Sequence, residues 1–251
     1  AIVAYLQERS AGMDVNTVSL GYRYTSLSLQ GPASRACIQP LTDADLSNEA
    51  LNLFEFVHTN LAGIEDVIIS RTGFTGELGY ELFVPTQSAE DLWETLLDRG
   101  EPHGLIPCGV AAMVSLRIEK RYPIYGRDIF EDTNPVEAGL GWTIRDKAAD
   151  YPGKAIVEAA KKAGPERLLV LLEMQDGADK PAPGAVLSVE GQDVGQVTTA
   201  GMGHSVGCAL AMGFVTIAHA NDGTMITVAG DALAKVSRGP VYDPKNLRTK
   251  H

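Results

Sequence analysis

Basic side chains are in short supply in this chain. It has 21 Lys and Arg residues against 32 Asp and Glu residues, which gives a net charge of −11. A negative protein disfavours non-specific binding to nucleic acid and to anionic lipid. From Glu166 onward there are 7 basic and 9 acidic residues, so this part carries −2 and the part before it carries 14 − 23 = −9. The asymmetry indicates two modules.

Cysteine and long apolar runs are also scarce. Cys37, Cys108 and Cys208 are odd in number and far apart, which argues against a disulfide framework and favours a reducing, cytoplasmic compartment. No two of the five histidines have metal-ligand spacing, so we expect no metal. No stretch approaches the roughly 18 to 20 apolar residues of a membrane span, and "AIVAYLQERS" lacks the features of a signal peptide. We therefore expect no membrane anchor.

The remaining composition is that of a globular protein, with 45% hydrophobic and 21% charged residues. The first part of the chain mixes helices and strands. Apolar periodicity, proline and glycine predict helices at 1–9, 32–40, 88–100 and 110–120, strands around 24–30, 66–70 and 80–85, and a hairpin between the last two strands.

The pattern changes to short strands from Arg167 onward. Six of them follow at close intervals, separated by glycine-bearing turns, which is typical of a small β-barrel or sandwich. A short helix lies before them, between Pro152-Gly153 and Gly164-Pro165, and "TAGMGHSVG" reads as a loop. We therefore expect an α+β fold with two domains, 1–164 and 165–251.

The stretch "RTGFTGELGYEL", residues 71–82, contains Gly73, Gly76 and Gly79. It matches neither phosphate-loop template, because no Gly-Lys-Ser/Thr is present and a strand follows where those motifs need a helix. A β-turn between paired strands is the simple interpretation. In the strand that follows, Tyr80, Leu82 and Val84 face one way while Glu81 faces the other.

A carboxylate beside an apolar strand needs hydrogen-bond partners. Glu81 could reach solvent or an arginine. It could also accept two parallel hydrogen bonds from a flat heterocycle with adjacent N–H donors.

Several blocks in series resemble the glycine-cleavage T-protein (aminomethyltransferase) family. They are "RTGFTGELGYELFVP", "PCGVAAMVSLRIEK", "YGRDIFEDTNPVEAGLGWTI", "YPGKAIVEAA" and "YDPKN". The resemblance implies tetrahydrofolate-binding lobes of antiparallel strands and helices, followed by a C-terminal β-barrel. It identifies Glu81 with the family's pterin-binding glutamate and places Phe74 and Trp142 beside the folate. It also implies that the three glycines let the hairpin lie against the flat ring.

The resemblance leaves other residues open. Met113 and Val114 stand where the family usually has an Arg-Asp pair that contacts folate, and Arg117 lies one turn further on the face of Met113. Arg117 could contact the ligand or form a structural ion pair. Tyr242 could fold back toward the folate cavity or serve packing alone. Tyr125, Arg127 and Asp128 of "YGRDI" could reach the ligand or fix the loop, and Asp128 could be an acid or base if buried.

The resemblance implies transfer of an aminomethyl or methyl group to tetrahydrofolate, from a small-molecule donor or a lipoyl carrier protein. Two alternatives are a folate-binding module of a dimethylglycine or sarcosine dehydrogenase-type protein and a non-catalytic folate-binding protein. The family's catalytic aspartate lies upstream of the segment that matches Ala1. We therefore expect a missing N-terminal segment or partner chain, and no catalysis by these 251 residues alone.

Overall fold

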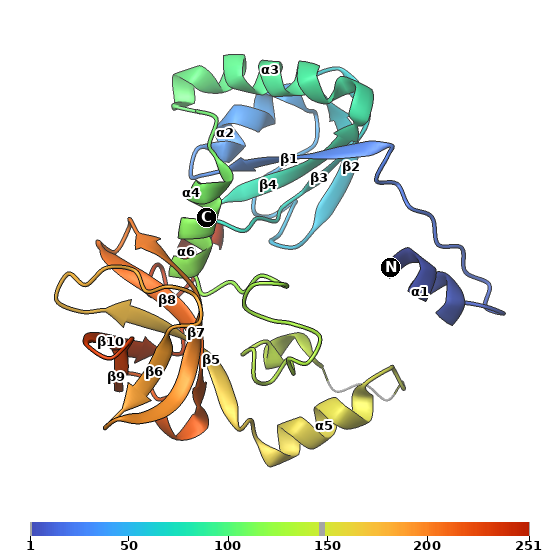
Figure 1. The fold of residues 1–251 in the computed structure, drawn as a ribbon. Coiled ribbons are helices and arrows are strands. Elements are labelled where there is room, and N and C mark those ends of the chain that lie inside the picture. Colours follow the sequence, from blue (N-terminus) through green and yellow to red (C-terminus); the bar gives the residue numbers. More distant parts are fainter. Residues whose placement is uncertain (1, 146–148, 251) are drawn as a thin grey trace. The chain divides into compact units, whose positions relative to one another are not determined.

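The computed structural model describes residues 2–145 and 149–250 (Figure 1). These residues form two compact units that interleave along the chain. Unit 1 comprises residues 1–73, 77–107 and 247–251, and unit 2 comprises residues 74–76 and 108–246. Within the described ranges, no helix combines the length and the apolar character needed to cross a bilayer.

Unit 1 contains a four-stranded antiparallel sheet in the order β1-β4-β3-β2. The predicted hairpin is confirmed, because β3 pairs with β4. The strands and helices of this unit are α1 (Ile2–Arg9), β1 (Tyr24–Gln30), α2 (Ser34–Ile38), η1 (Gln39–Leu41), β2 (Phe56–Leu61), β3 (Ile64–Ser70), β4 (Gly79–Pro85), η2 (Thr86–Ser88), α3 (Ala89–Gly100), η3 (Glu101–His103) and α6 (Leu247–Lys250).

The core of unit 1 lies on one face of this sheet. Tyr80, Leu82 and Val84 of β4 are fully buried, and they share a cluster with Leu92 and Leu96 of α3. Helices α2 and α3 lie on the same side of the sheet in Figure 1. The opposite face carries Glu81 and Phe83, which are half-buried. The predicted alternation along β4 is thus confirmed.

Three local features of unit 1 differ from the sequence-based expectation. Strand β2 was not predicted, because its alternation Phe56 to Leu61 is interrupted by polar residues and becomes clear only in its pairing with β3. Pro32 precedes α2, which starts two residues later. The helix expected at 88–100 begins at Ala89, after Ser88 at its N-cap.

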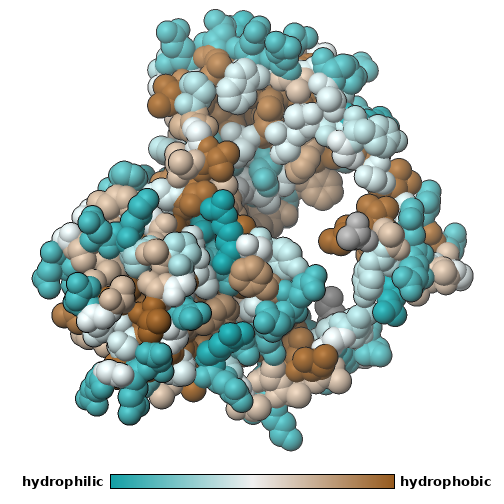
Figure 2. Space-filling model, viewed as in Figure 1, coloured by the Kyte–Doolittle hydropathy of each residue, from teal (hydrophilic) through white to brown (hydrophobic). Residues whose placement is uncertain are grey.

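Several large apolar side chains of residues 2–22 are exposed. Helix α1 has no buried residue. Figure 2 shows brown side chains on α1 and the segment after it. The large exposed apolar residues here are Ile2, Tyr5, Leu6, Met13, Val15, Val18, Leu20 and Tyr22.

Unit 2 contains a closed six-stranded barrel in the order β10-β5-β8-β7-β6-β9. All six predicted strands are present. Their bounds, with the helices of unit 2, are α4 (Val110–Glu119), η4 (Gly141–Thr143), α5 (Lys154–Ala163), β5 (Arg167–Met174), β6 (Val186–Val189), β7 (Gln192–Gly203), β8 (Cys208–Thr216), η5 (Ile217–His219), β9 (Met225–Val228) and β10 (Ala232–Ser237).

The barrel strands alternate side chains between the barrel interior and its outer surface. Val170, Leu172 and Met174 of β5 join one buried cluster, whereas Leu169 and Leu171 join a second cluster with Ile118 of α4. Because both faces of β5 are covered, its sequence is almost continuously apolar.

The expectation of a loop at "TAGMGHSVG" was wrong for residues 199–203, because β7 runs on to Gly203 and pairs with β8 up to Cys208, and only residues 204–207 form a turn. The small residues there mark a long twisted hairpin. The predicted domain boundary at 164/165 stays a prediction. The contacts group the described part of residues 108–164 with the barrel strands in unit 2.

Candidate functional site

Glu81 occupies the middle of the open face of the unit 1 sheet. Its strand, β4, is central, and the register places Ser28 of β1 on one side of Glu81 and Ser70 of β3 on the other. Small polar neighbours leave space above the carboxylate. The half-buried Phe83 follows on the same face and adds an apolar surface.

Hydroxyl groups orient the Glu81 carboxylate. The Thr72 hydroxyl lies 2.5 Å from Glu81 Oε2 and 3.0 Å from the Ser70 hydroxyl. An ionised carboxylate only accepts hydrogen bonds, so Thr72 donates to Glu81 and accepts from Ser70. Among the described residues, Oε1 of Glu81 has no hydrogen-bond partner. One oxygen is therefore held while the other stays open to a donor.

The glycines of this stretch have a different role from the one expected. A Cβ at Gly73 or Gly79 would lie 2.1 or 2.0 Å from the side-chain oxygen of Gln30, and a Cβ at Gly76 would lie 2.3 Å from Lys120 Cγ. The expectation that these glycines make room for a flat ring is thus not supported. Protein side chains fill the space that the missing Cβ atoms leave.

In unit 2, Lys120 ties together two segments that the resemblance assigns to the folate site. Its buried Nζ donates to the Asp243 carbonyl (2.8 Å) and to Asn246 Oδ1 (2.7 Å), next to Tyr242. Its stem passes over Gly76, close to Phe74 in the sequence. Lys120 thus joins the 74–76 turn to the segment around Tyr242.

Phe74 lies half-buried in that turn. Its ring centroid is 5.6 Å from that of Tyr122. Burial, and after it the negative charge of Asp243, raise the pKa of the Tyr122 phenol, which therefore stays protonated at neutral pH. The backbone N–H of Tyr242 donates to the Glu119 carbonyl (3.3 Å). Phe74 and Tyr242 are thus both anchored near the C-terminal end of α4.

Of the two interpretations of Arg117, the structural ion pair matches the contacts. The guanidinium is fully buried and donates to Asp128, to Thr199 (3.0 Å) and to the Tyr122 carbonyl (3.0 Å). These partners hold the guanidinium inside the protein, and Nε is buried without a hydrogen-bond partner among the described residues. We therefore no longer propose Arg117 as a ligand contact.

Asp128 is buried, as an acid or base would require, but both of its oxygens accept hydrogen bonds from the protein. Besides Arg117, they accept from the Ile124 N–H and the Thr198 hydroxyl, both at 2.8 Å. The carboxylate therefore fixes the loop that follows α4, and we assign it no catalytic role.

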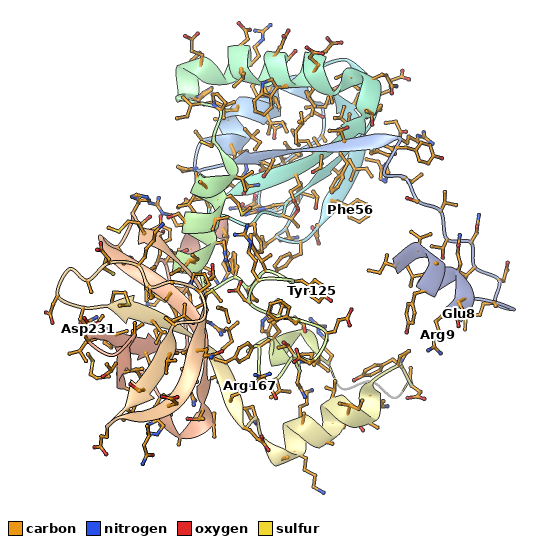
Figure 3. All side chains as sticks on the ribbon, in the orientation of Figure 1. Glu8, Arg9, Phe56, Tyr125, Arg167 and Asp231 are labelled. Carbon is orange, nitrogen blue, oxygen red and sulfur yellow. The ribbon has the colours of Figure 1, made fainter. Side chains whose placement is uncertain are left out.

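The other predicted residues lie in unit 2 as well. Met113 is half-buried on α4. Trp142 lies in η4 with 71% of its surface exposed. Tyr125, labelled in Figure 3, is also exposed, as is Arg127. Their contact with a ligand stays a prediction.

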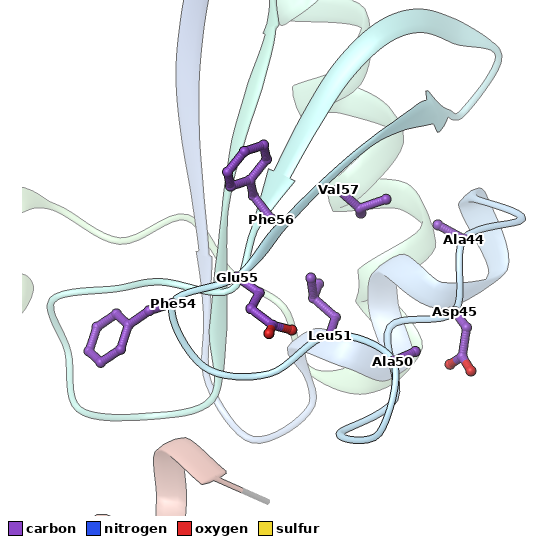
Figure 4. Close-up of a pocket in the computed structure, with 8 residues that line it drawn as sticks. All are labelled: Ala44, Asp45, Ala50, Leu51, Phe54, Glu55, Phe56 and Val57. Carbon is purple, nitrogen blue, oxygen red and sulfur yellow. The ribbon is translucent and has the colours of Figure 1, made fainter.

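Two hollows in the structure lie away from Glu81. One of about 500 Å³ in unit 1 is lined by residues of 44–57, among them Phe54 and Phe56 (Figure 4). Another of about 650 Å³ lies beside the barrel and includes Arg127 and Arg167. Neither includes Glu81. Within the part of the chain that the structure describes, no three His, Cys, Asp or Glu side chains gather as metal ligands do.

Comparison with known families matches both parts of the chain. Residues 1–148 match the GCVT N-terminal domain, and residues 167–243 match the glycine cleavage T-protein C-terminal barrel domain. The chain belongs to the glycine cleavage T-protein family. The resemblance noted from its motifs is thereby confirmed.

Relatives in this family are similar over nearly the whole chain. Aminomethyltransferases of Symbiobacterium thermophilum and Bacillus subtilis are each 34% identical over 96% of this chain, which covers 65% and 66% of their lengths. The crystal structure of glycine cleavage system aminomethyltransferase T from Bartonella henselae superposes with a TM-score of 0.83 at 30% identity, over 97% of this chain and 66% of that one. The chain thus spans about two thirds of the T-proteins it matches.

Two residues of the candidate site were missed in the sequence analysis. Thr72 was treated as part of a turn, although its place two residues after a strand-ending serine puts a hydroxyl near Glu81. Gln30 could not be found from the sequence, because its role depends on lying directly opposite Gly79 in the strand register.

Proposed function

We propose that this T-protein chain binds tetrahydrofolate through Glu81 and takes part in transfer of an aminomethyl group to it. The observation that carries the proposal is the Glu81 carboxylate, which stands on an open sheet face with Oε2 held by Thr72 and Oε1 available. The names of the relatives, all aminomethyltransferases, favour transfer over a dehydrogenase-associated module.

The residues present fit a pterin. Its amino-pyrimidinone edge offers adjacent N–H donors, and a carboxylate pairs with such an edge through two charge-assisted hydrogen bonds. The hydroxyl relay from Ser70 to Thr72 fixes the plane of the Glu81 carboxylate before binding. The apolar surface of Phe83 on the same face suits the ring itself.

Bound tetrahydrofolate would supply N5 as the acceptor of the one-carbon group. The contribution of this chain is to bind and orient, because alignment of two reactants accounts for much of the rate of such a transfer. Glu81 would hold the pterin end, and we propose Phe74, Met113, Trp142 and Tyr242 as further contacts. The donor would be a small amine or a lipoyl carrier protein, in the cytoplasm.

The test is calorimetric titration of Glu81→Ala with tetrahydrofolate. Loss of a charge-assisted pair should weaken binding by about 1.5 to 3 kcal/mol. Glu65→Ala serves as control, because Glu65 is an exposed carboxylate on the neighbouring strand β3. Unchanged affinity in Glu81→Ala would exclude the proposed site.

That these 251 residues do not catalyse one-carbon transfer on their own stays a prediction. Tetrahydrofolate-dependent ammonia release should be near background for this chain, and should appear when it is joined to the remaining third of a T-protein. Positioned acid–base groups typically contribute about 10² to 10⁴-fold. Equal turnover by both proteins would contradict it.

A further inference from the structure

Gln30 lies directly opposite Gly79 on the neighbouring strand, and its side chain covers the glycine-rich turn. A Cβ at Gly79 or Gly73 would collide with its amide oxygen. The two glycines therefore bring the backbone of the turn close enough to meet the amide. An ordinary side chain at either position would displace Gln30.

The amide of Gln30 holds the backbone on both sides of Glu81. Its Nε2 donates to the Thr72 carbonyl (3.2 Å) and to the Tyr80 carbonyl (3.3 Å). Tyr80 directly precedes Glu81, and Thr72 donates its hydroxyl to Glu81 Oε2. One side chain thus fixes both the strand that carries the carboxylate and the hydroxyl that orients it.

We propose that Gln30 is a positioning residue for the Glu81 carboxylate in tetrahydrofolate binding. The proposal rests on the proposed function of Glu81. Binding groups must be held by their neighbours to within a fraction of an ångström to give full affinity. Without the Gln30 amide, the Thr72 carbonyl loses a donor, the turn relaxes, and the Thr72 hydroxyl no longer holds the carboxylate in one orientation.

Gln30→Met tests this role, because methionine has a similar length but donates no hydrogen bond. In the intact protein, tetrahydrofolate affinity should fall about tenfold, which corresponds to the net value of one to two hydrogen bonds. In a Glu81→Ala background, the same substitution should change affinity less than twofold. Such a loss of effect shows that Gln30 acts through Glu81.

Gln39→Met is the matched control. Gln39 is another part-buried glutamine of unit 1, and it bonds the Ala44 carbonyl (2.8 Å) and the Leu46 N–H (2.9 Å). Its substitution should lower the urea midpoint about as much as Gln30→Met does, and leave tetrahydrofolate affinity unchanged. This control separates loss of stability from loss of positioning.

The outcomes distinguish the two proposals. If Glu81→Ala alone leaves affinity unchanged, the proposed function fails. If Glu81→Ala weakens binding while Gln30→Met has no effect, or an equal effect in both backgrounds, only the role of Gln30 is overturned. Where Glu81→Ala binds too weakly to measure, Thr72→Val provides the second background, since it removes the hydroxyl and keeps Glu81.

Discussion

At the scale of single residues, the candidate site depends on uncharged neighbours of one carboxylate. Ser70, Thr72 and Gln30 supply the hydroxyl and amide groups that orient Glu81. The face of the sheet on which Glu81 lies could be predicted from the alternation of side chains along β4. The role of the glycines could not be predicted, because it depends on which side chain of the neighbouring strand lies opposite them.

Gly79→Ala tests whether Gly79 is needed to leave room for the Gln30 amide. Gly79 does not need a left-handed backbone, and the three atoms nearest to an added Cβ all belong to Gln30. Displacing the amide breaks its hydrogen bonds to two carbonyls, and the unfolding free energy should fall by about 1 to 3 kcal/mol in urea denaturation. In a Gln30→Ala background, the same change should cost less than about 0.5 kcal/mol. Gly21→Ala, at an open position, is the control; an equal cost in both Gln30 backgrounds would refute the clash.

At the scale of elements, local pattern predicted most of the fold. The six barrel strands could be read because each is a short apolar run between glycine turns. Strand β2 was missed, and the length of β7 was underestimated, because both depend on pairing with a partner strand. The loop after α4 also depends on a tertiary contact, the buried pair of Arg117 and Asp128.

Asp128→Ala should destabilise unit 2 strongly. It leaves the fully buried Arg117 without its counter-charge, and breaking a buried ion pair from one side costs about 3 to 5 kcal/mol. Urea denaturation followed by circular dichroism measures the loss. Asp132→Ala, in the same loop but exposed, should change stability by less than about 0.5 kcal/mol. A small effect of Asp128→Ala would mean that water reaches the guanidinium.

At the scale of the whole molecule, the two units have separate hydrophobic cores, and both ends of the chain belong to unit 1. The buried residues of the unit 1 cluster lie within 29–96, and those of the unit 2 clusters lie within 118–236. The chain then returns to unit 1 with α6. Such a return is not readable from local sequence patterns, because it depends on contacts between residues far apart in the chain, among them a buried hydrogen bond of Arg71.

That contact predicts an effect of removing residues 248–251. The buried Arg71 donates to the Leu51 carbonyl (2.8 Å) and, across 178 positions, to the Thr249 carbonyl (3.0 Å). A buried charged donor that loses its acceptor costs about 1 to 3 kcal/mol. Unit 1 should therefore be destabilised by that amount, although its sheet and core stay intact.

The two tryptophans of the chain allow this to be measured in unit 1 alone. Trp93 lies in α3 of unit 1 and Trp142 in unit 2, so a Trp142→Phe background leaves fluorescence that reports on unit 1. Truncation should shift the Trp93 transition to lower urea. In an Arg71→Met background, truncation leaves no buried guanidinium without its acceptor, so the Trp93 transition should shift much less. If truncation leaves the urea midpoint of the Trp93 transition unchanged, the Thr249 carbonyl contributes nothing to the stability of unit 1. The return of the chain to unit 1 would then follow from the fold without stabilising it.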